Sequence, residues 1–304
     1  MTHLSGHDTI ASNSQLVRRT GLARLIDFLI LTKPRITLLV LVTTWAGFAL
    51  SVPGGTWTWW PLLPALIGTA LCCMAAGTLN QVAESEIDAR MRRTRCRPLP
   101  SGRLTHLEAL LFGLGLAAVG TGILCVATHW LAAVAATLTL GVYVLVYTPL
   151  KRFSPIALYV GAIAGAIPPL IGSAAATGTL TAAAWSLFAI QFLWQIPHFL
   201  AIGWIYRQDY AAAGLRLLPA IDSKATLYHL FIGSLVLVPV GLAPTIWHIS
   251  GPTHFLTALI CGLAFLAVAM ALLISPSHRQ ARVVFFTSLI YLPLVLATMW
   301  IDRV

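Results

Sequence analysis

Residues 80–98 are Asn80-Gln-Val-Ala-Glu84-Ser-Glu86-Ile-Asp88-Ala-Arg90-Met-Arg92-Arg93-Thr-Arg95-Cys-Arg97-Pro98, and they put three carboxylates and five arginines directly after an apolar run. If the helix predicted for that run continues, Asn80, Glu84 and Asp88 recur every four residues and share one face. Glu86 then lies on the other side. Carboxylates at this spacing can hold Mg²⁺, while guanidinium groups can hold phosphate oxygens. The stretch therefore predicts a diphosphate site at the membrane surface.

The composition identifies an integral membrane protein. Of 304 residues, 58% are hydrophobic and only 9% are charged, which excludes a soluble globular domain. The five cysteines form no CxxC pair, so neither a disulfide framework nor a cysteine metal site is expected. The net charge of +10 does not indicate nucleic-acid binding, because the cations are not interleaved with stacking aromatic residues.

The apolar segments predict an all-α, polytopic membrane protein. A crossing needs roughly 17 to 25 apolar residues. We expect residues 1–20 to be a disordered segment and residues 21–304 to be a single membrane-embedded domain that begins with a short amphipathic helix. The predicted spans are 36–53, 61–80, 107–127, 131–148, 156–176, 184–205, 226–248, 254–274 and 283–301.

The distribution of basic residues predicts the orientation. With nine spans, 18 of the 19 Lys and Arg residues fall on one side of the membrane. The positive-inside rule then places the N-terminus in the cytosol and the C-terminus outside. Every Asp and Glu except Asp302 lies on the same basic side, so we expect the chemistry at the cytosolic face.

Two shorter cytosolic connections carry further candidates. Lys151 and Arg152 follow the fourth span, and they are either interfacial anchors or phosphate contacts. Asp209 is the acid nearest the membrane in the next connection. It either pairs with Arg207 or Arg216, or it faces the first acidic group and helps to hold a metal.

The fifth and sixth spans contain prolines. Pro168-Pro169 and Pro197 free backbone carbonyls, so both spans are expected to be kinked and to line a cavity. His198 lies beside this kink. Within a membrane it is either a functional group or a neutral histidine that a neighbouring helix satisfies.

Four stretches resemble the signature blocks of the protohaem IX farnesyltransferase (haem O synthase) family, a branch of the intramembrane prenyltransferases. The match extends from about residue 22 to the last span, with the blocks in the family's order. The stretches are Leu31-Thr32-Lys33-Pro34-Arg35-Ile36, residues 80–98, residues 147–169, and Trp194-Gln195-Ile196-Pro197-His198-Phe199 with Asp209-Tyr210.

The resemblance implies nine helices around a central cavity, farnesyl diphosphate as donor, haem b as acceptor and Mg²⁺ as cofactor. The short N-terminus favours the bacterial cytoplasmic (inner) membrane over the mitochondrial inner membrane as the expected location. Haem O hydroxylase and terminal oxidase assembly factors are candidate partners. The implied catalytic residues are Asn80, Glu84, Asp88, Asp209 and Lys151. The implied metal ligands are Glu84, Glu86, Asp88 and Asp209. The implied substrate-binding residues are Arg95, Arg97, Arg152, Tyr147, Gln195, His198 and Arg207.

The chain departs from the family pattern at two places. Glu84 and Glu86 stand where the family usually has Asp, which moves each carboxylate out by one methylene. Ala213 stands where the wider superfamily has a second Asp. In lacking this Asp, the chain resembles the haem branch. Two alternatives remain open. One is a prenyltransferase for an aromatic acceptor. The other is an anion transporter with a basic entry funnel, although the internal repeats common in transporters are not evident.

Overall fold

The fold is helical throughout the part of the chain that the computed structural model describes, residues 21–52 and 59–304. The predicted disordered segment 1–20 lies outside these residues. Nine helical segments of the described chain are long and apolar enough to cross a membrane, which confirms the predicted number and order of spans. In chain order the elements are α1 (Gly21–Leu31), α2 (Pro34–Ser51), α3 (Trp59–Arg90), α4 (His106–Ala127), α5 (Trp130–Gly141), η1 (Val142–Tyr147), α6 (Thr148–Leu150), α7 (Ala157–Ala166), α8 (Pro168–Thr177), α9 (Ala182–Ile205), α10 (Arg207–Ala212), α11 (Leu218–Ile221), α12 (Ser223–Ile246), α13 (Pro252–Ile274) and α14 (His278–Ile301).

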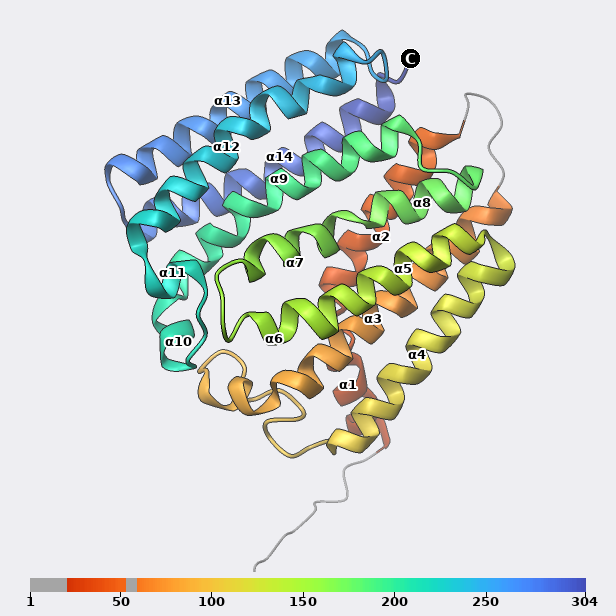
Figure 1. The fold of residues 1–304 in the computed structure, drawn as a ribbon, viewed down its shortest axis with the longest axis vertical. Helices are drawn as coiled ribbons and strands as arrows, with labels where there is room; N and C mark the ends of the chain where they lie inside the picture. Colours follow the sequence, from red (N-terminus) through yellow and green to blue (C-terminus); the bar gives the residue numbers. More distant parts are fainter. Residues whose placement is uncertain (1–20, 53–58) are drawn as a thin grey trace, which may run out of the picture.

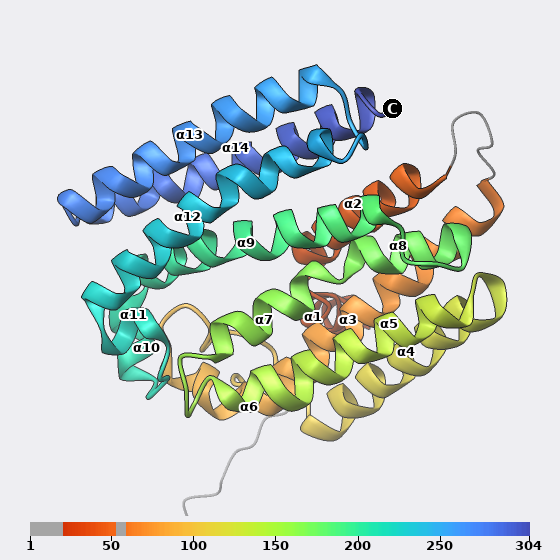
Figure 2. The ribbon, with the colours of Figure 1, turned by 45° about the horizontal axis from the view of Figure 1, so that its top comes forward.

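The helices form two groups. Helices α9, α12, α13 and α14 pack together on one side of the molecule, and α2, α3, α4, α5, α7 and α8 form the other side (Figure 1 and Figure 2). Helix α1 and the C-terminus lie at opposite ends of the bundle (Figure 1), as an odd number of crossings requires. The end that contains α6, α10 and residues 91–105 is called the charged end below.

Helix α3 is longer than the sequence predicted. The apolar run suggested an end near residue 80, but the helix continues to Arg90. Its last residues carry the three carboxylates, so the acids are presented on a rigid helix, whereas the four arginines of residues 80–98 that come after Arg90 lie in the loop that follows. The conditional expectation that the helix continues past its apolar run is confirmed.

Glycine lets α2 and α8 approach backbone to backbone. A Cβ atom added to Gly172 would lie 2.0 Å from the carbonyl oxygen of Thr44, and one added to Gly47 would lie 2.1 Å from that of Pro169. Small residues at such crossings allow close helix packing within a membrane. This contact fixes α8 against α2, next to the pocket described below.

The fifth span is interrupted between α7 and α8, at Pro168-Pro169, where the sequence predicted a kink. Pro169 has no N–H to donate to the carbonyl oxygen of Gly165 four residues earlier. Gln191 Nε2 on α9 donates to this oxygen at 2.9 Å instead. A polar side chain from the neighbouring span therefore satisfies the carbonyl that the break exposes.

Candidate functional site

The acidic stretch presents one buried face and one exposed face. Asn80, Glu84 and Asp88 are buried at 2%, 7% and 1% exposure, whereas Glu86 is exposed. The four-residue spacing on α3 produces this division. The carboxylates of Glu84 and Asp88 therefore turn into the bundle, and Glu86 turns away from it.

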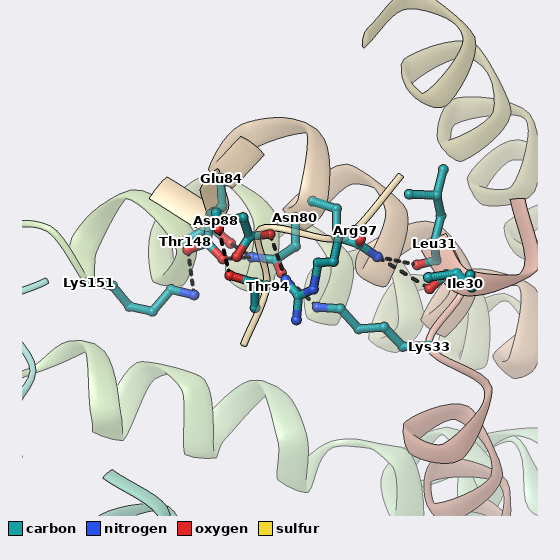
Figure 3. Close-up of polar contacts among 11 residues, drawn as sticks. Ile30, Leu31, Lys33, Asn80, Glu84, Asp88, Thr94, Arg97, Thr148 and Lys151 are labelled. Carbon is teal, nitrogen blue, oxygen red and sulfur yellow. Dashed lines mark hydrogen bonds and ion pairs between the residues drawn. The ribbon is translucent and has the colours of Figure 1, made fainter. Parts of the chain in front are cut away.

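A chain of polar contacts connects three segments of the protein at this face (Figure 3). Lys33 Nζ donates to Asn80 Oδ1 at 2.7 Å. Asn80 Nδ2 donates to Glu84 Oε2 at 2.9 Å and to Thr148 Oγ1 at 3.0 Å. Lys151 Nζ lies 2.5 Å from Glu84 Oε1. The side chain of Asn80 thus joins the α1–α2 junction, α3 and the start of α6.

The loop that follows α3 folds back on Asp88. Arg97 Nη1 donates to Asp88 Oδ2 at 2.6 Å, and Thr94 Oγ1 donates to the carbonyl oxygen of Asp88 at 2.8 Å. Arg152 Nη2 donates to the carbonyl oxygen of Ala83 at 3.0 Å, and Arg95 is exposed. The structure thus brings Arg97 and Lys151 to the acidic face from two different connections, and it places Arg152 against the backbone of α3 beside that face.

The charges of the cluster shift the pKa values of its lysines. Burial, with the positive charges of Arg97 and Lys151, lowers the pKa of Lys33 to about 8. Burial by itself would also lower the pKa of Lys151, but Tyr147 and the Glu84 carboxylate outweigh it and raise this pKa above its ordinary value. Lys151 therefore stays charged near neutral pH, whereas Lys33 is poised to lose its proton in mild alkali.

An apolar pocket of about 120 Å³ begins beside the cluster and is lined by α2, α3, α5, α7 and α8. Most of its wall consists of small or apolar side chains, and Tyr143 of the π-helical segment η1 contributes a ring. Among the described residues, Lys33 is the one charged side chain that lines it. The ammonium group that contacts Asn80 therefore stands where the apolar pocket meets the acidic face.

Asp209 comes from α10, on the segment that covers the end of α3. Ile87 of α3 and Met91, just after its end, pack with Ala213 and Leu215 in one apolar cluster. The backbone N–H of Arg216 donates to the carbonyl oxygen of Lys151 at 3.0 Å. The two acid-bearing connections therefore pack against each other, and the metal role of Asp209 stays a prediction.

The predicted set of four metal ligands is not preformed. Within residues 21–52 and 59–304 there is no group of three or more His, Cys, Asp or Glu side chains that could hold a metal ion. Glu86 in particular lies on the exposed side of α3. The oxygen donors of Glu84 and Asp88 nevertheless fit Mg²⁺, which is commonly held by one or two carboxylates together with substrate phosphates.

Three other predicted substrate-binding residues lie on or beside α9, apart from the acidic cluster. Gln195 Nε2 donates to the carbonyl oxygens of Gln191 at 3.2 Å and Ala162 at 3.4 Å. Arg207 stacks over Trp204 with its guanidinium carbon 4.6 Å from the ring centroid. Neither Gln195 nor Arg207 is among the described residues that line the apolar pocket.

His198 faces α14 rather than the pocket. Its Nδ1 lies 2.7 Å from Ser288 Oγ, and its ring stacks on Trp194 with centroids 4.7 Å apart and on Phe285 with centroids 5.3 Å apart. Trp194 Nε1 donates to the carbonyl oxygen of Ser288 at 2.7 Å. This environment supports the second of the two interpretations, a histidine satisfied by a neighbouring helix.

Sequence reasoning did not assign a role to Lys33, Thr148 or Tyr143. Lys33 stood in a quoted block, and the available signal was a cation directly before the proline that begins a span. Its left-handed backbone, with φ of 50°, turns the chain between α1 and α2 and aims the side chain inward. Thr148 and Tyr143 carry no distinguishing sequence pattern, because an isolated Thr or Tyr at a span end is common.

Comparison with known proteins is consistent with this architecture. Residues 40–290 match the model of the UbiA prenyltransferase family. A protein named protoheme IX farnesyltransferase from Solibacter usitatus is 42% identical over 91% of this chain and 98% of its own length. A protein of the same name from Koribacter versatilis is 39% identical over 94% of this chain and 96% of its own length.

Solved structures share the fold. A structure described as digeranylgeranylglyceryl phosphate synthase superposes with a TM-score of 0.78 at 20% identity, over 92% of this chain and 98% of that one. A UbiA homologue from Archaeoglobus fulgidus bound to GPP and Mg²⁺ gives a TM-score of 0.64 at 14% identity, over 90% and 99% of the two chains. The family model covers most of the chain, and the relatives match almost its whole length. The chain therefore belongs to the UbiA prenyltransferase family.

Proposed function

We propose that this protein transfers the farnesyl group of farnesyl diphosphate to a vinyl group of haem b and so forms haem O. The relatives named protoheme IX farnesyltransferase, 39–42% identical over more than nine-tenths of the chain, support this choice of substrates. The observation that carries it in the structure is the junction at Lys33, where an apolar pocket adjoins a buried cluster of carboxylates and cations. A prenyl diphosphate needs both environments side by side.

The cations provide the diphosphate site. Lys33, Lys151 and Arg97 already lie around the acidic face of α3, and Arg95 and Arg152 lie on the same connections. Phosphate oxygens replace part of their present contacts when the donor binds. Guanidinium and ammonium groups at such a site stabilise negative charge as it develops on the leaving group.

Glu84 and Asp88 are the proposed ligands of Mg²⁺, with Asp209 approaching from α10. Structures of a UbiA homologue bound to GPP and Mg²⁺ support the use of a divalent metal in this family. When bound, Mg²⁺ supplies positive charge next to the diphosphate oxygens. Asn80 orients the Glu84 carboxylate through its amide, and Lys33 holds the amide oxygen of Asn80.

The reaction proceeds by ionisation of the allylic C–O bond, and the electron pair leaves with the diphosphate. The apolar walls of the pocket exclude water from the farnesyl cation, and the ring of Tyr143 offers an aromatic face that can stabilise it. A haem vinyl group attacks the cation. Water then adds to the new cation next to the porphyrin and releases a proton, which leaves a hydroxyethylfarnesyl group.

The charged end is proposed to face the cytosol of a bacterial cell, in the inner membrane. The asymmetry of Lys and Arg residues supports this orientation. A donor made in the cytosol then reaches Lys33, Lys151 and the arginines without crossing the bilayer.

Reconstitution tests the proposal directly. Purified protein in lipid nanodiscs is incubated with haem b, farnesyl diphosphate and MgCl₂, and the pigments are analysed by mass spectrometry. We expect haem O, and we expect EDTA to abolish its formation. Farnesylation of an aromatic acid in place of haem would favour the aromatic-acceptor enzyme, and anion flux into vesicles without any product would favour the transporter.

A further inference from the structure

A second pocket lies between α7, α9 and the α10–α11 segment, which meet at the charged end (Figure 1). Its volume is about 90 Å³. The lining is mostly apolar and includes Tyr147, Leu158, Phe199, Ile202, Tyr210 and Leu217. Phe199 is 38% exposed, so the pocket borders the outer surface of the bundle. Phe199 also belongs to the Trp194–Phe199 block.

The two pockets are separated by a pair of tyrosines. Tyr143 lines the first pocket and Tyr147 lines the second, and their ring centroids are 5.1 Å apart. Both rings belong to η1, a π-helical segment, and such segments frequently occur at functional sites. Lys151 Nζ lies 4.6 Å from the centroid of the Tyr147 ring and 2.5 Å from Glu84. The second pocket is therefore one aromatic ring away from the proposed diphosphate site.

The rim of the second pocket is positively charged. Arg93 stacks over Tyr206 at 4.9 Å and over Tyr210 at 6.0 Å. Among the described residues it has no carboxylate partner, unlike Arg97. Arg216, next to Leu217, is exposed as well. The acids nearest in the sequence are Asp209, beside Tyr210, and Asp88, which is buried and paired with Arg97. Glu86, two residues before Asp88, lies on the exposed side of α3.

We infer that this second pocket receives the edge of the acceptor, with the acceptor's carboxylates bound at the rim by Arg93. The inference rests on the proposed function. Haem b is flat and apolar and carries two propionates on the edge opposite its vinyl groups. A propionate held at Arg93 directs the vinyl edge into the second pocket, toward Tyr147. The donor lies on the other side of Tyr147. The pocket seats that edge of the macrocycle, not the whole of it.

The charge at Arg93 is tested by haem titration in the absence of donor. We expect Arg93→Gln to weaken haem b binding about tenfold, the effect of one lost charge-assisted hydrogen bond. The matched control is Arg92→Gln, because Arg92 is exposed and makes no ring or carboxylate contact in the described structure. Haem b dimethyl ester, which lacks the carboxylates, should bind wild type and Arg93→Gln equally. Equal weakening by the two substitutions, or a loss with the ester as large as with haem b, overturns the inference.

The apolar part of the pocket is tested by filling it. Ile202 lines the pocket, so Ile202→Trp should raise the KM for haem b at least tenfold while leaving the KM for farnesyl diphosphate unchanged. Ile221→Trp is the control, since Ile221 is 51% exposed on α11 and does not line this pocket. A rise confined to the KM for farnesyl diphosphate would instead assign the pocket to the donor.

Different results would contradict the acceptor site and the proposed reaction. If wild-type protein makes haem O but Arg93→Gln titrates like Arg92→Gln, the acceptor site is wrong and the proposed function stands. If haem binding depends on Arg93 but no haem O forms from farnesyl diphosphate, the acceptor site stands and the proposed reaction is wrong.

Discussion

The charged end of α3 and the α9–α14 contact both bury polar side chains, but they satisfy them differently. At α3, Glu84 and Asp88 are held by cations from separate connections, beside an apolar pocket. At α9, His198 is held by the neutral hydroxyl of Ser288 and by two stacked rings. Ion pairs next to a pocket can exchange partners with a charged ligand, whereas a neutral pair enclosed by rings cannot. Burial of a polar group therefore marks function only where a ligand can compete for it.

The largest expected effect comes from the charge of Glu84. We expect Glu84→Gln to lower kcat/KM for farnesyl diphosphate by about 100- to 1000-fold, as for loss of a preorganised electrostatic group, since it removes an oxygen donor and leaves Lys151 unpaired. Steady-state assays of haem O formation measure this. Glu86→Gln, on the exposed side of the same helix, should retain nearly full activity. Similar losses in both variants would show that the buried carboxylate contributes no more to activity than the exposed one.

Removal of Lys33 should have a smaller effect, concentrated on the donor. Lys33→Ala deletes the cation where the pocket meets the acidic face, so we expect the KM for farnesyl diphosphate to rise about tenfold or more. The KM for haem b should not change. Lys224→Ala is the matched control, because it also removes one lysine but at the first turn of α12. If the KM for haem b rises instead, Lys33 contributes to the binding of haem b and not of farnesyl diphosphate.

The same residue predicts a pH dependence. Because the pKa of Lys33 is lowered to about 8, its ammonium is present below that pH and is lost as the pH rises through it. Donor binding should therefore weaken above pH 8, and kcat/KM for farnesyl diphosphate should fall there. In Lys33→Arg the fall should move to higher pH, because a guanidinium stays protonated. An unchanged alkaline limb in this variant would assign the titration to another group.

The α9–α14 contact should affect stability more than substrate binding. His198→Ala removes the hydrogen bond between His198 and Ser288, whose hydroxyl keeps its bond to the carbonyl oxygen of Phe285. It also removes a stacked ring, so we expect a loss of about 1–3 kcal/mol in the free energy of unfolding, seen as a lower thermal midpoint in detergent. Ser288→Ala should also lower the midpoint. Haem b affinity should stay unchanged in both. A selective loss of haem binding in His198→Ala would restore the substrate-binding role that the sequence analysis gave to His198.

Much of the architecture could be predicted from local pattern. Span number, the break at Pro168-Pro169 and the shared face of Asn80, Glu84 and Asp88 all follow from apolar length, a missing N–H or helical period. The pairings could not be predicted in this way. Lys33 and Asn80 are 47 residues apart, and Ser288 and His198 are 90 apart. Such contacts depend on how whole helices are placed against one another.

The amino-acid sequence by itself determined a nine-span membrane protein with its charges gathered at one end, because a bilayer imposes segment lengths and charge asymmetry on each stretch of chain independently. Only the tertiary structure decided that Lys33 lies where the pocket meets the acidic face, that Lys151 and Arg97 pair with Glu84 and Asp88, and that His198 packs against α14. Those outcomes arise from packing between distant segments, where small residues such as Gly47 and Gly172 set how closely the helices approach.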